Sequence, residues 1–147
     1  MAEYPGKLND FIETFEMFPD RETRMQLLLD CADRFHEVPS HIAQRPFPES
    51  HRVPYCESEA FVWAVNQPDR AIKLYFAVEN PQGISAKALA TILDESLSGY
   101  PANAAASVPT DLAYKIFGRE LTMGKGMGLT GMVQMVQAQA KRLLANE

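Results

Sequence analysis

Residues 60–78, in the central part of the chain, read AFVWAVNQPDRAIKLYFAV and give the clearest structural pattern in the sequence. Its first half is apolar at nearly every position, which predicts a strand buried on both faces. Its second half alternates apolar residues with Lys73 and Tyr75, which predicts a half-buried strand. Gln67-Pro68-Asp69-Arg70 between the halves has turn chemistry. The stretch therefore predicts an antiparallel hairpin.

Upstream of the hairpin, the sequence predicts two helices and a long connector. Apolar residues recur at helical spacing over residues 8–18, and Asp20 is placed to cap a second helix. Cys31 lies on the apolar stripe of that helix, beside Leu28. Residues 38–54 contain Pro39, Pro46, Pro48 and Pro54, which favours an extended connection over a helix.

Downstream of the hairpin, the sequence predicts three helices. Ser85 opens the first, which Gly99 ends. Thr110 is expected to cap a short helix that Gly118 closes. The glycine-rich segment 123–128 is expected to be a flexible lead into the last helix, which carries an apolar face.

Composition narrows the class of protein. The 147 residues are 46% hydrophobic and 22% charged, as in an ordinary globular domain, so disordered chains and disulfide miniproteins are excluded. With helices on both sides of a small antiparallel sheet, we expect a single α+β domain over residues 1–147, with its core at about 8–144. The net charge of −5 argues against a nucleic-acid partner.

Localisation is predicted from what the sequence lacks. No apolar run approaches the roughly 20 residues of a membrane helix, and the first residues lack the pattern of a signal peptide. Two cysteines do not make a disulfide framework. We therefore expect a cytoplasmic protein without a membrane partner, in which a cysteine is kept for reactivity or for packing.

Cys56 is the first candidate for chemistry. It follows the connector and precedes the first strand, and Pro54 restrains the backbone there. Functional groups are frequent on loops that a rigid element anchors. His51 and Arg52 would favour a thiolate at this position, whereas Glu57 would oppose it. The alternative is that Cys56 is a small buried side chain, as free cysteine often is.

Other candidate sites carry weaker signals. Cys31 is expected to be inert packing. The cysteines and histidines form no Cys-x-x-Cys or His-x-x-x-His pair, so we expect no metal site. The segment 123–128 lacks the sequence and the preceding strand of a phosphate-binding loop, and we favour partner contact through Lys125 or a purely structural role. Met123 and Met127, flanked by glycine, are expected to line a groove around the thiol.

The segment around Cys56 resembles a known signature. Arg52-Val53-Pro54-Tyr55-Cys56-Glu57-Ser58, followed by Phe61-Val62-Trp63, is similar to the sequence around the active cysteine of SufE-type sulfur acceptor proteins. The resemblance implies a fold like that of iron–sulfur scaffold proteins. It also implies that Cys56 takes persulfide sulfur from a pyridoxal-phosphate cysteine desulfurase of the SufS type and activates that enzyme. The sulfur would pass to an iron–sulfur scaffold complex, and the carrier itself would need no cofactor.

Three departures from the family pattern accompany the resemblance. Tyr55 replaces a usual glycine, and Glu57 replaces a typical glutamine. Met123-Gly124-Lys125 replaces a Pro-Ser-Arg-like segment, and lysine lacks the planar fork with which arginine grips a carboxylate. The residues that we expect to contact the partner are Arg52, Tyr55, Glu57, Ser58, Lys125 and Met127.

Two other classes of protein fit the same residues. One is a non-catalytic interaction module that regulates a desulfurase or another partner, in which Cys56 packs and the segment 123–128 docks. The other is a peroxidatic thiol protein, in which Cys56 would readily form a sulfenic acid. A serine hydrolase has no support, because the sequence has no Gly-x-Ser-x-Gly motif.

Overall fold

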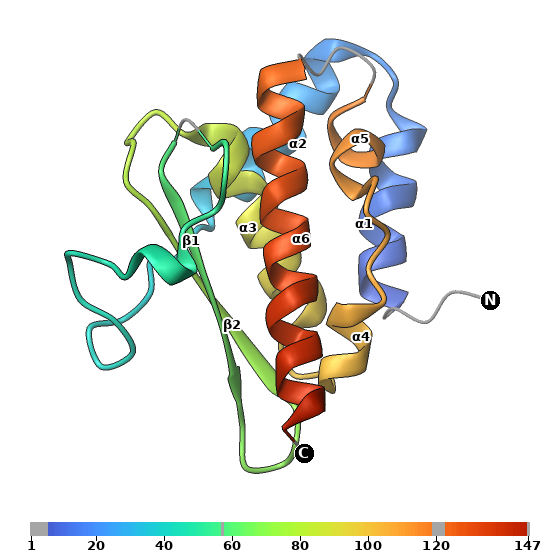
Figure 1. Cartoon of the computed structure of the whole chain (residues 1–147). Coiled ribbons are helices and arrows are strands. Elements are labelled where there is room, and N and C mark those ends of the chain that lie inside the picture. The colour runs from blue at the N-terminus through green and yellow to red at the C-terminus, as the bar shows by residue number, and fades with distance from the viewer. Residues whose placement is uncertain (1–5, 57, 119–122, 147) are drawn as a thin grey trace.

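The structure is a computed structural model that describes residues 6–56, 58–118 and 123–146. Figure 1 shows a two-stranded sheet with helices packed on one side of it and the long connector on the other. The described residues thus form an α+β domain. In chain order, the elements are α1 (Gly6–Met17), α2 (Arg21–Asp33), a short 3₁₀ turn η1 (Glu49–His51), β1 (Ala60–Asn66), β2 (Ile72–Val78), α3 (Ile84–Leu97), α4 (Ala102–Ala106), α5 (Leu112–Phe117) and α6 (Met123–Ala145).

The predicted hairpin is confirmed. β1 and β2 pair antiparallel, from Ala60 opposite Val78 to Asn66 opposite Ile72. In the turn, the Gln67 N–H donates to the Ala71 carbonyl at 2.8 Å. The turn chemistry read from the sequence therefore places the two strands in register.

Each face of the sheet has its own core. The inner face, with Val62 and Leu74, packs on the helices, and α3 supplies several fully buried side chains there. On the outer face, Phe61 and Trp63 of β1 are buried by the connector. The Phe47 ring lies 5.2 Å from each of these two rings. The apolar run of β1 is thus buried on both faces, as predicted, because the extended connector covers the second one.

The second helix begins where the sequence predicts. The Asp20 carboxylate accepts a hydrogen bond from the Thr23 N–H at 2.9 Å, so it caps α2. Cys31 lies inside α2 and is only 4% exposed. Gly99, after α3, and Gly118, after α5, have φ of 92° and 83°, which explains why glycine ends each helix.

Several predicted details of the later helices are wrong. α3 begins at Ile84 with Gly83 as its N-cap, one residue before Ser85. The N-cap of α5 is Asp111 rather than Thr110. The hydroxyl of Thr110 instead lies 3.4 Å from Nε2 of Gln137. The short helix α4 was not predicted, since five residues give no readable apolar period.

The glycine-rich segment 123–128 is the largest correction, because it forms the first turns of α6 and not a flexible lead into it. Glycine costs about 1 kcal/mol relative to alanine inside a helix, which is why a helical conformation was not expected for these residues. Tertiary contacts explain the difference: a β-carbon on Gly126 would collide with the Tyr114 ring and hydroxyl. Within the described residues, no helix has the length and apolarity needed to cross a bilayer.

Candidate functional site

Cys56 lies on a short loop between the connector and β1. We call residues 54–59 the cysteine loop; Glu57 lies outside the described residues. The Val53 N–H donates to the Ala60 carbonyl at 2.8 Å and closes the base of the loop. The Glu59 N–H donates to the Cys56 carbonyl at 3.1 Å. The thiol is therefore carried on a loop that the sheet anchors.

The backbone on both sides of Cys56 is left-handed. Tyr55 has a φ of 61° and Glu59 a φ of 52°. This conformation costs a residue with a β-carbon roughly 1 kcal/mol or more, and such residues persist where their surroundings hold them in place. The Tyr55 side chain is 74% exposed. Packing of its ring within this chain therefore does little to offset the cost.

Two glycines of α6 hold one side of the cysteine loop. A β-carbon built on Gly128 would lie 3.0 Å from the Cα of Cys56 and 3.0 Å from the carbonyl oxygen of Tyr55. A β-carbon on Gly131 would lie 2.9 Å from the carbonyl oxygen of Pro54. The loop can lie directly against the α6 backbone because these positions carry no side chain.

The segment between β2 and α3 holds the other side of the loop. The Asn80 N–H donates to the Ser58 carbonyl at 3.1 Å, and the Glu79 N–H to the Glu59 carbonyl at 3.2 Å. A β-carbon on Gly83, just before α3, would lie 2.7 Å from the Ser58 hydroxyl. The cysteine loop is thus held between α6 and the segment that leads into α3.

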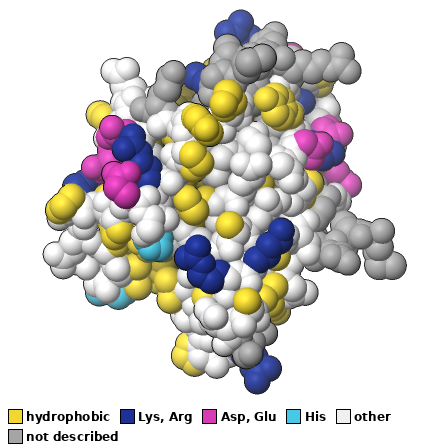
Figure 2. Space-filling model, in the orientation of Figure 1, with side chains coloured by type: hydrophobic (Ala, Val, Ile, Leu, Met, Phe, Trp, Pro, Cys, Tyr) yellow, Lys and Arg dark blue, Asp and Glu magenta, His cyan; other side chains and the backbone are white. Residues whose placement is uncertain are grey.

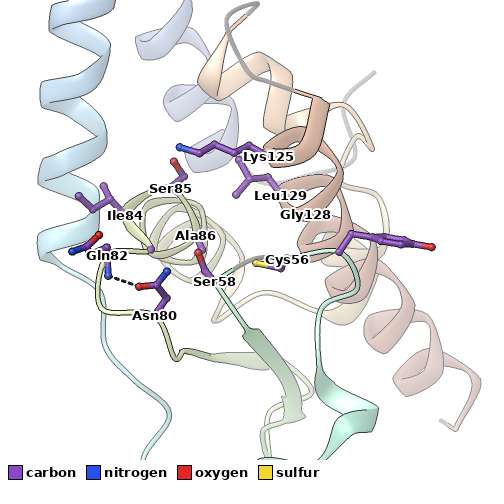
Figure 3. Close-up of a pocket in the computed structure, with 12 residues that line it drawn as sticks. Cys56, Ser58, Asn80, Gln82, Ile84, Ser85, Ala86, Lys125, Gly128 and Leu129 are labelled. Atoms are coloured by element: carbon purple, nitrogen blue, oxygen red, sulfur yellow. Dashed lines mark hydrogen bonds between the residues drawn. The ribbon is translucent and has the colours of Figure 1, made fainter.

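A cavity of about 200 Å³ opens beneath the cysteine loop. Figure 3 shows the Cys56 sulfur pointing into it, toward the start of α3. A water molecule takes up roughly 30 Å³, so one additional sulfur atom has ample room. The lining residues come from the loop, the segment before α3, the first turn of α3 and the start of α6; they are Tyr55, Cys56, Ser58, Asn80, Gln82, Gly83, Ile84, Ser85, Ala86, Lys125, Gly128 and Leu129.

Cys56 also lines a second hollow at the surface. This open hollow is lined by Glu49, Arg52, Val53, Pro54 and Tyr55 as well as Cys56. Cys56 itself is partly buried and is a free thiol. Cys56 therefore borders both the cavity and this open surface.

The cavity favours negative charge. The first turn of α3 lines it, and a helix start carries partial positive charge from backbone N–H groups that have no partner within the helix. Lys125 of α6 stands at its edge (Figure 3). An anionic sulfur in the cavity would therefore lie near the partial positive charge at the start of α3.

The basic residues expected to act on the thiol have other partners. Nδ1 of His51 lies 2.8 Å from the Val62 carbonyl, and the ring stacks on Trp63. The Arg52 guanidinium lies 3.7 Å from the carboxylates of Glu49 and Glu59. The 3₁₀ turn directs the His51 ring onto the sheet, whereas Arg52 lines the same hollow as Cys56.

The six expected partner contacts fall in different places. Tyr55, Ser58 and Lys125 line the cavity with Cys56, and Arg52 lines the open hollow. Met127 is 47% exposed but does not line the cavity. Glu57 and the Met123 side chain lie outside what the structure describes.

Sequence reasoning missed the far wall of the cavity. Asn80, Gln82 and the first turn of α3 lie more than twenty residues beyond Cys56, and the hairpin brings them back to it. The turn signal at Asn80-Pro81-Gln82-Gly83 was readable as the end of a strand. The contact of this turn with the cysteine loop could not be read from the sequence, because the contact depends on the register of the hairpin.

Cys31 differs from Cys56 in its surroundings. Burial raises the pKa of the Cys31 thiol, against an opposing effect of the Arg34 guanidinium, whose Nη2 lies 3.8 Å from the sulfur. The burial expected from the helical pattern is confirmed. Among the described residues, no group of three or more His, Cys, Asp or Glu side chains is placed to hold a metal ion.

Fold and site together define an α+β domain that presents one partly buried thiol above a small cavity. The sequence matches the profile of the SufE family, described as an Fe-S metabolism associated domain, over residues 9–140. The chain belongs to the SufE family, and this associates it with iron–sulfur metabolism. The resemblance to the SufE family is thereby confirmed.

A solved structure supports the fold assignment. The solution structure of a hypothetical protein from Thermus thermophilus is similar to this chain with a TM-score of 0.76 and 30% sequence identity. The similarity covers 97% of this chain and 98% of that one. A comparison with curated proteins gave no match.

Proposed function

We propose that the protein is a sulfur acceptor that takes persulfide sulfur from a cysteine desulfurase onto Cys56. The observation that carries the proposal is the position of Cys56, a partly buried thiol on an anchored loop above a cavity with room for one more sulfur. Family membership supports the link to iron–sulfur metabolism. The donor is a pyridoxal-phosphate enzyme of the SufS type, and the recipient is an iron–sulfur scaffold complex in the cytoplasm.

The transfer is an exchange between sulfur atoms. The Cys56 thiolate attacks the outer sulfur of the donor persulfide, and a new S–S bond forms on Cys56. The S–S bond on the donor breaks at the same time, and the donor cysteine leaves as a thiolate that takes up a proton. The outer sulfur keeps its oxidation state, so the step needs no additional oxidant or reductant.

The cavity gives the loaded carrier a place for its cargo. The outer sulfur of the Cys56 persulfide lies beneath the loop, away from reductants in solution. Transfer requires the opposite state, in which the loop presents this sulfur to another protein. A partner that binds the presented state better shifts the population toward it.

The direct test is to incubate the protein with a cysteine desulfurase and cysteine and to map added sulfur by mass spectrometry. We expect one sulfur on Cys56 of the parent and none on Cys56→Ser, which also loses stimulation of the desulfurase. Cys31→Ser is the matched control and keeps both. A Cys56→Ser variant that stimulates sulfur release as well as the parent would refute the proposal.

One observation favours a second function, that of a regulatory interaction module without transfer chemistry. Tyr55 and Met127 are large, exposed and near the thiol, as interface residues often are. In that case, Cys56→Ala would bind and activate the desulfurase as well as the parent.

The peroxidatic alternative has a separate test. A reaction of Cys56 with peroxide no faster than that of free cysteine would exclude it.

A further inference from the structure

Tyr55 is held in a backbone conformation that favours glycine. Its φ is 61°, and its carbonyl oxygen lies against Gly128 of α6, so the seated loop fixes this conformation. A glycine would give the loop the same course without the steric conflict. The tyrosine side chain is therefore not required for the fold, and its presence calls for another explanation.

The Tyr55 ring faces solvent rather than the core of the protein. The side chain is 74% exposed, and its hydroxyl has no hydrogen-bond partner among the described residues. Among the residues whose burial the structure describes, it is the most exposed large hydrophobic one. An aromatic ring left in water beside a nucleophile is available to another molecule.

Two more exposed apolar residues lie near the same loop. Ile84 lines the cavity with Tyr55 and is 41% exposed. Met127 is 47% exposed and precedes Gly128, which contacts the loop. Figure 2 shows hydrophobic side chains exposed over the upper part of α6 and beside it, with charged side chains set around them. Exposed apolar side chains thus lie beside the cysteine loop, among the polar residues that line the cavity, and such a mixture is found at protein interfaces.

We propose that Tyr55 determines which donor can load Cys56: its ring enters an apolar recess beside the persulfide-bearing cysteine of the desulfurase. This inference rests on the proposed function and names the chemistry of the partner's surface. Tyrosine is frequent among the residues that dominate interface energies, because it buries a large ring with few rotatable bonds. A donor with a polar surface at that point leaves the ring without a partner and loads Cys56 poorly.

The test compares Tyr55→Gly, Tyr55→Phe and the parent as full chains. The rate of alanine release by the cysteine desulfurase of the same organism is measured against carrier concentration. We expect Tyr55→Gly to raise the KM for the carrier by about tenfold, as loss of an interface anchor does, and to leave kcat within about twofold. Tyr55→Phe keeps the parental KM because the ring is what docks. Glycine accepts φ of 61°, so the thermal midpoint of Tyr55→Gly stays near that of the parent.

Tyr100→Ala is the matched control, because Tyr100 is an exposed tyrosine near the turn of the hairpin and remote from Cys56. We expect this variant to keep the parental KM for the carrier. An unchanged KM for Tyr55→Gly, or a fall in kcat alone, would overturn the inference while sulfur still reached Cys56. If no sulfur reached Cys56 of the parent at any concentration, the proposed function itself would fail.

Discussion

A β-carbon on Gly128 would lie 3.0 Å from the Cα of Cys56, closer than packed carbon atoms approach one another. The nearest obstacles are backbone atoms of the cysteine loop, which cannot turn aside as a side chain can. The covered position of the thiol therefore depends on the absence of a side chain on α6.

Gly128→Ala is accordingly expected to displace the loop and expose Cys56. Alanine favours the helix itself, so the fold is kept while the loop loses its seat. Alkylation of Cys56 by iodoacetamide should accelerate by about tenfold, which corresponds to about 1.4 kcal/mol in favour of the open loop. Gly6→Ala is the control, because nothing lies within 4 Å of that position. Parental alkylation of Gly128→Ala would show that the loop does not rest on this glycine.

Cys31 should make stability depend on pH above neutrality. Burial raises the pKa of its thiol in the folded state, so folding disfavours the thiolate. This contribution is complete below the unfolded pKa of about 8.5 and is lost as the pH rises through the folded value. The comparison is between Cys56→Ser, which keeps Cys31, and the double variant Cys31→Ala/Cys56→Ser, which has no thiol. We expect the denaturation midpoint to fall more steeply between neutral and alkaline pH in the variant that keeps Cys31. Equal slopes would mean that Cys31 is not shielded from water.

Gln139 of α6 pairs with the free edge of β1 as a strand would. Its Oε1 accepts from the Ala64 N–H at 2.7 Å, and its Nε2 donates to the Val62 carbonyl at 2.7 Å. Gln139→Leu leaves the Ala64 N–H without a partner and the Val62 carbonyl with His51 alone, and should lower the free energy of unfolding by about 1–3 kcal/mol. Gln134→Leu, at an exposed position of the same helix, should change it little. Similar urea midpoints for the two variants would contradict this role.

The ion pair between Arg34 and Glu95 joins α2 to α3. The guanidinium meets the carboxylate at 2.8 Å and 3.0 Å, and hydrogen bonds from Arg34 lower the pKa of Glu95. Its contribution to stability is therefore complete above the unfolded pKa of about 4.3 and is lost as the pH falls through the lowered value. Because both side chains are partly exposed, Glu95→Gln should cost no more than about 1 kcal/mol at neutral pH. The difference between the two proteins should vanish in acid, and a constant difference would exclude an ionic origin.

Local patterns in the sequence predicted much of the fold. Alternation over residues 60–78 specified the hairpin, and Asp20 specified the start of α2, because each depends on neighbours in the chain. The segment 123–128 was misread because helix propensity depends only on neighbours in the chain. Glycine is needed at positions 126 and 128 because Tyr114 and the cysteine loop lie against the α6 backbone there.

The candidate site was only half readable from the sequence. Cys56 could be selected from its place after a proline-rich connector. The cavity beneath it could not, because its far wall comes from Asn80 and the start of α3. The left-handed φ of Tyr55 was also hidden, since tyrosine gives no local signal for that conformation.

A single-turnover experiment shows whether Cys56 receives the sulfur. A cysteine desulfurase carrying one persulfide, freed of excess cysteine, is mixed with an equal amount of this protein, and both chains are weighed and mapped by mass spectrometry. We predict that the sulfur leaves the enzyme and is found on the peptide that contains Cys56. Sulfur that stays on the enzyme, or that appears on the peptide containing Cys31, would contradict the account.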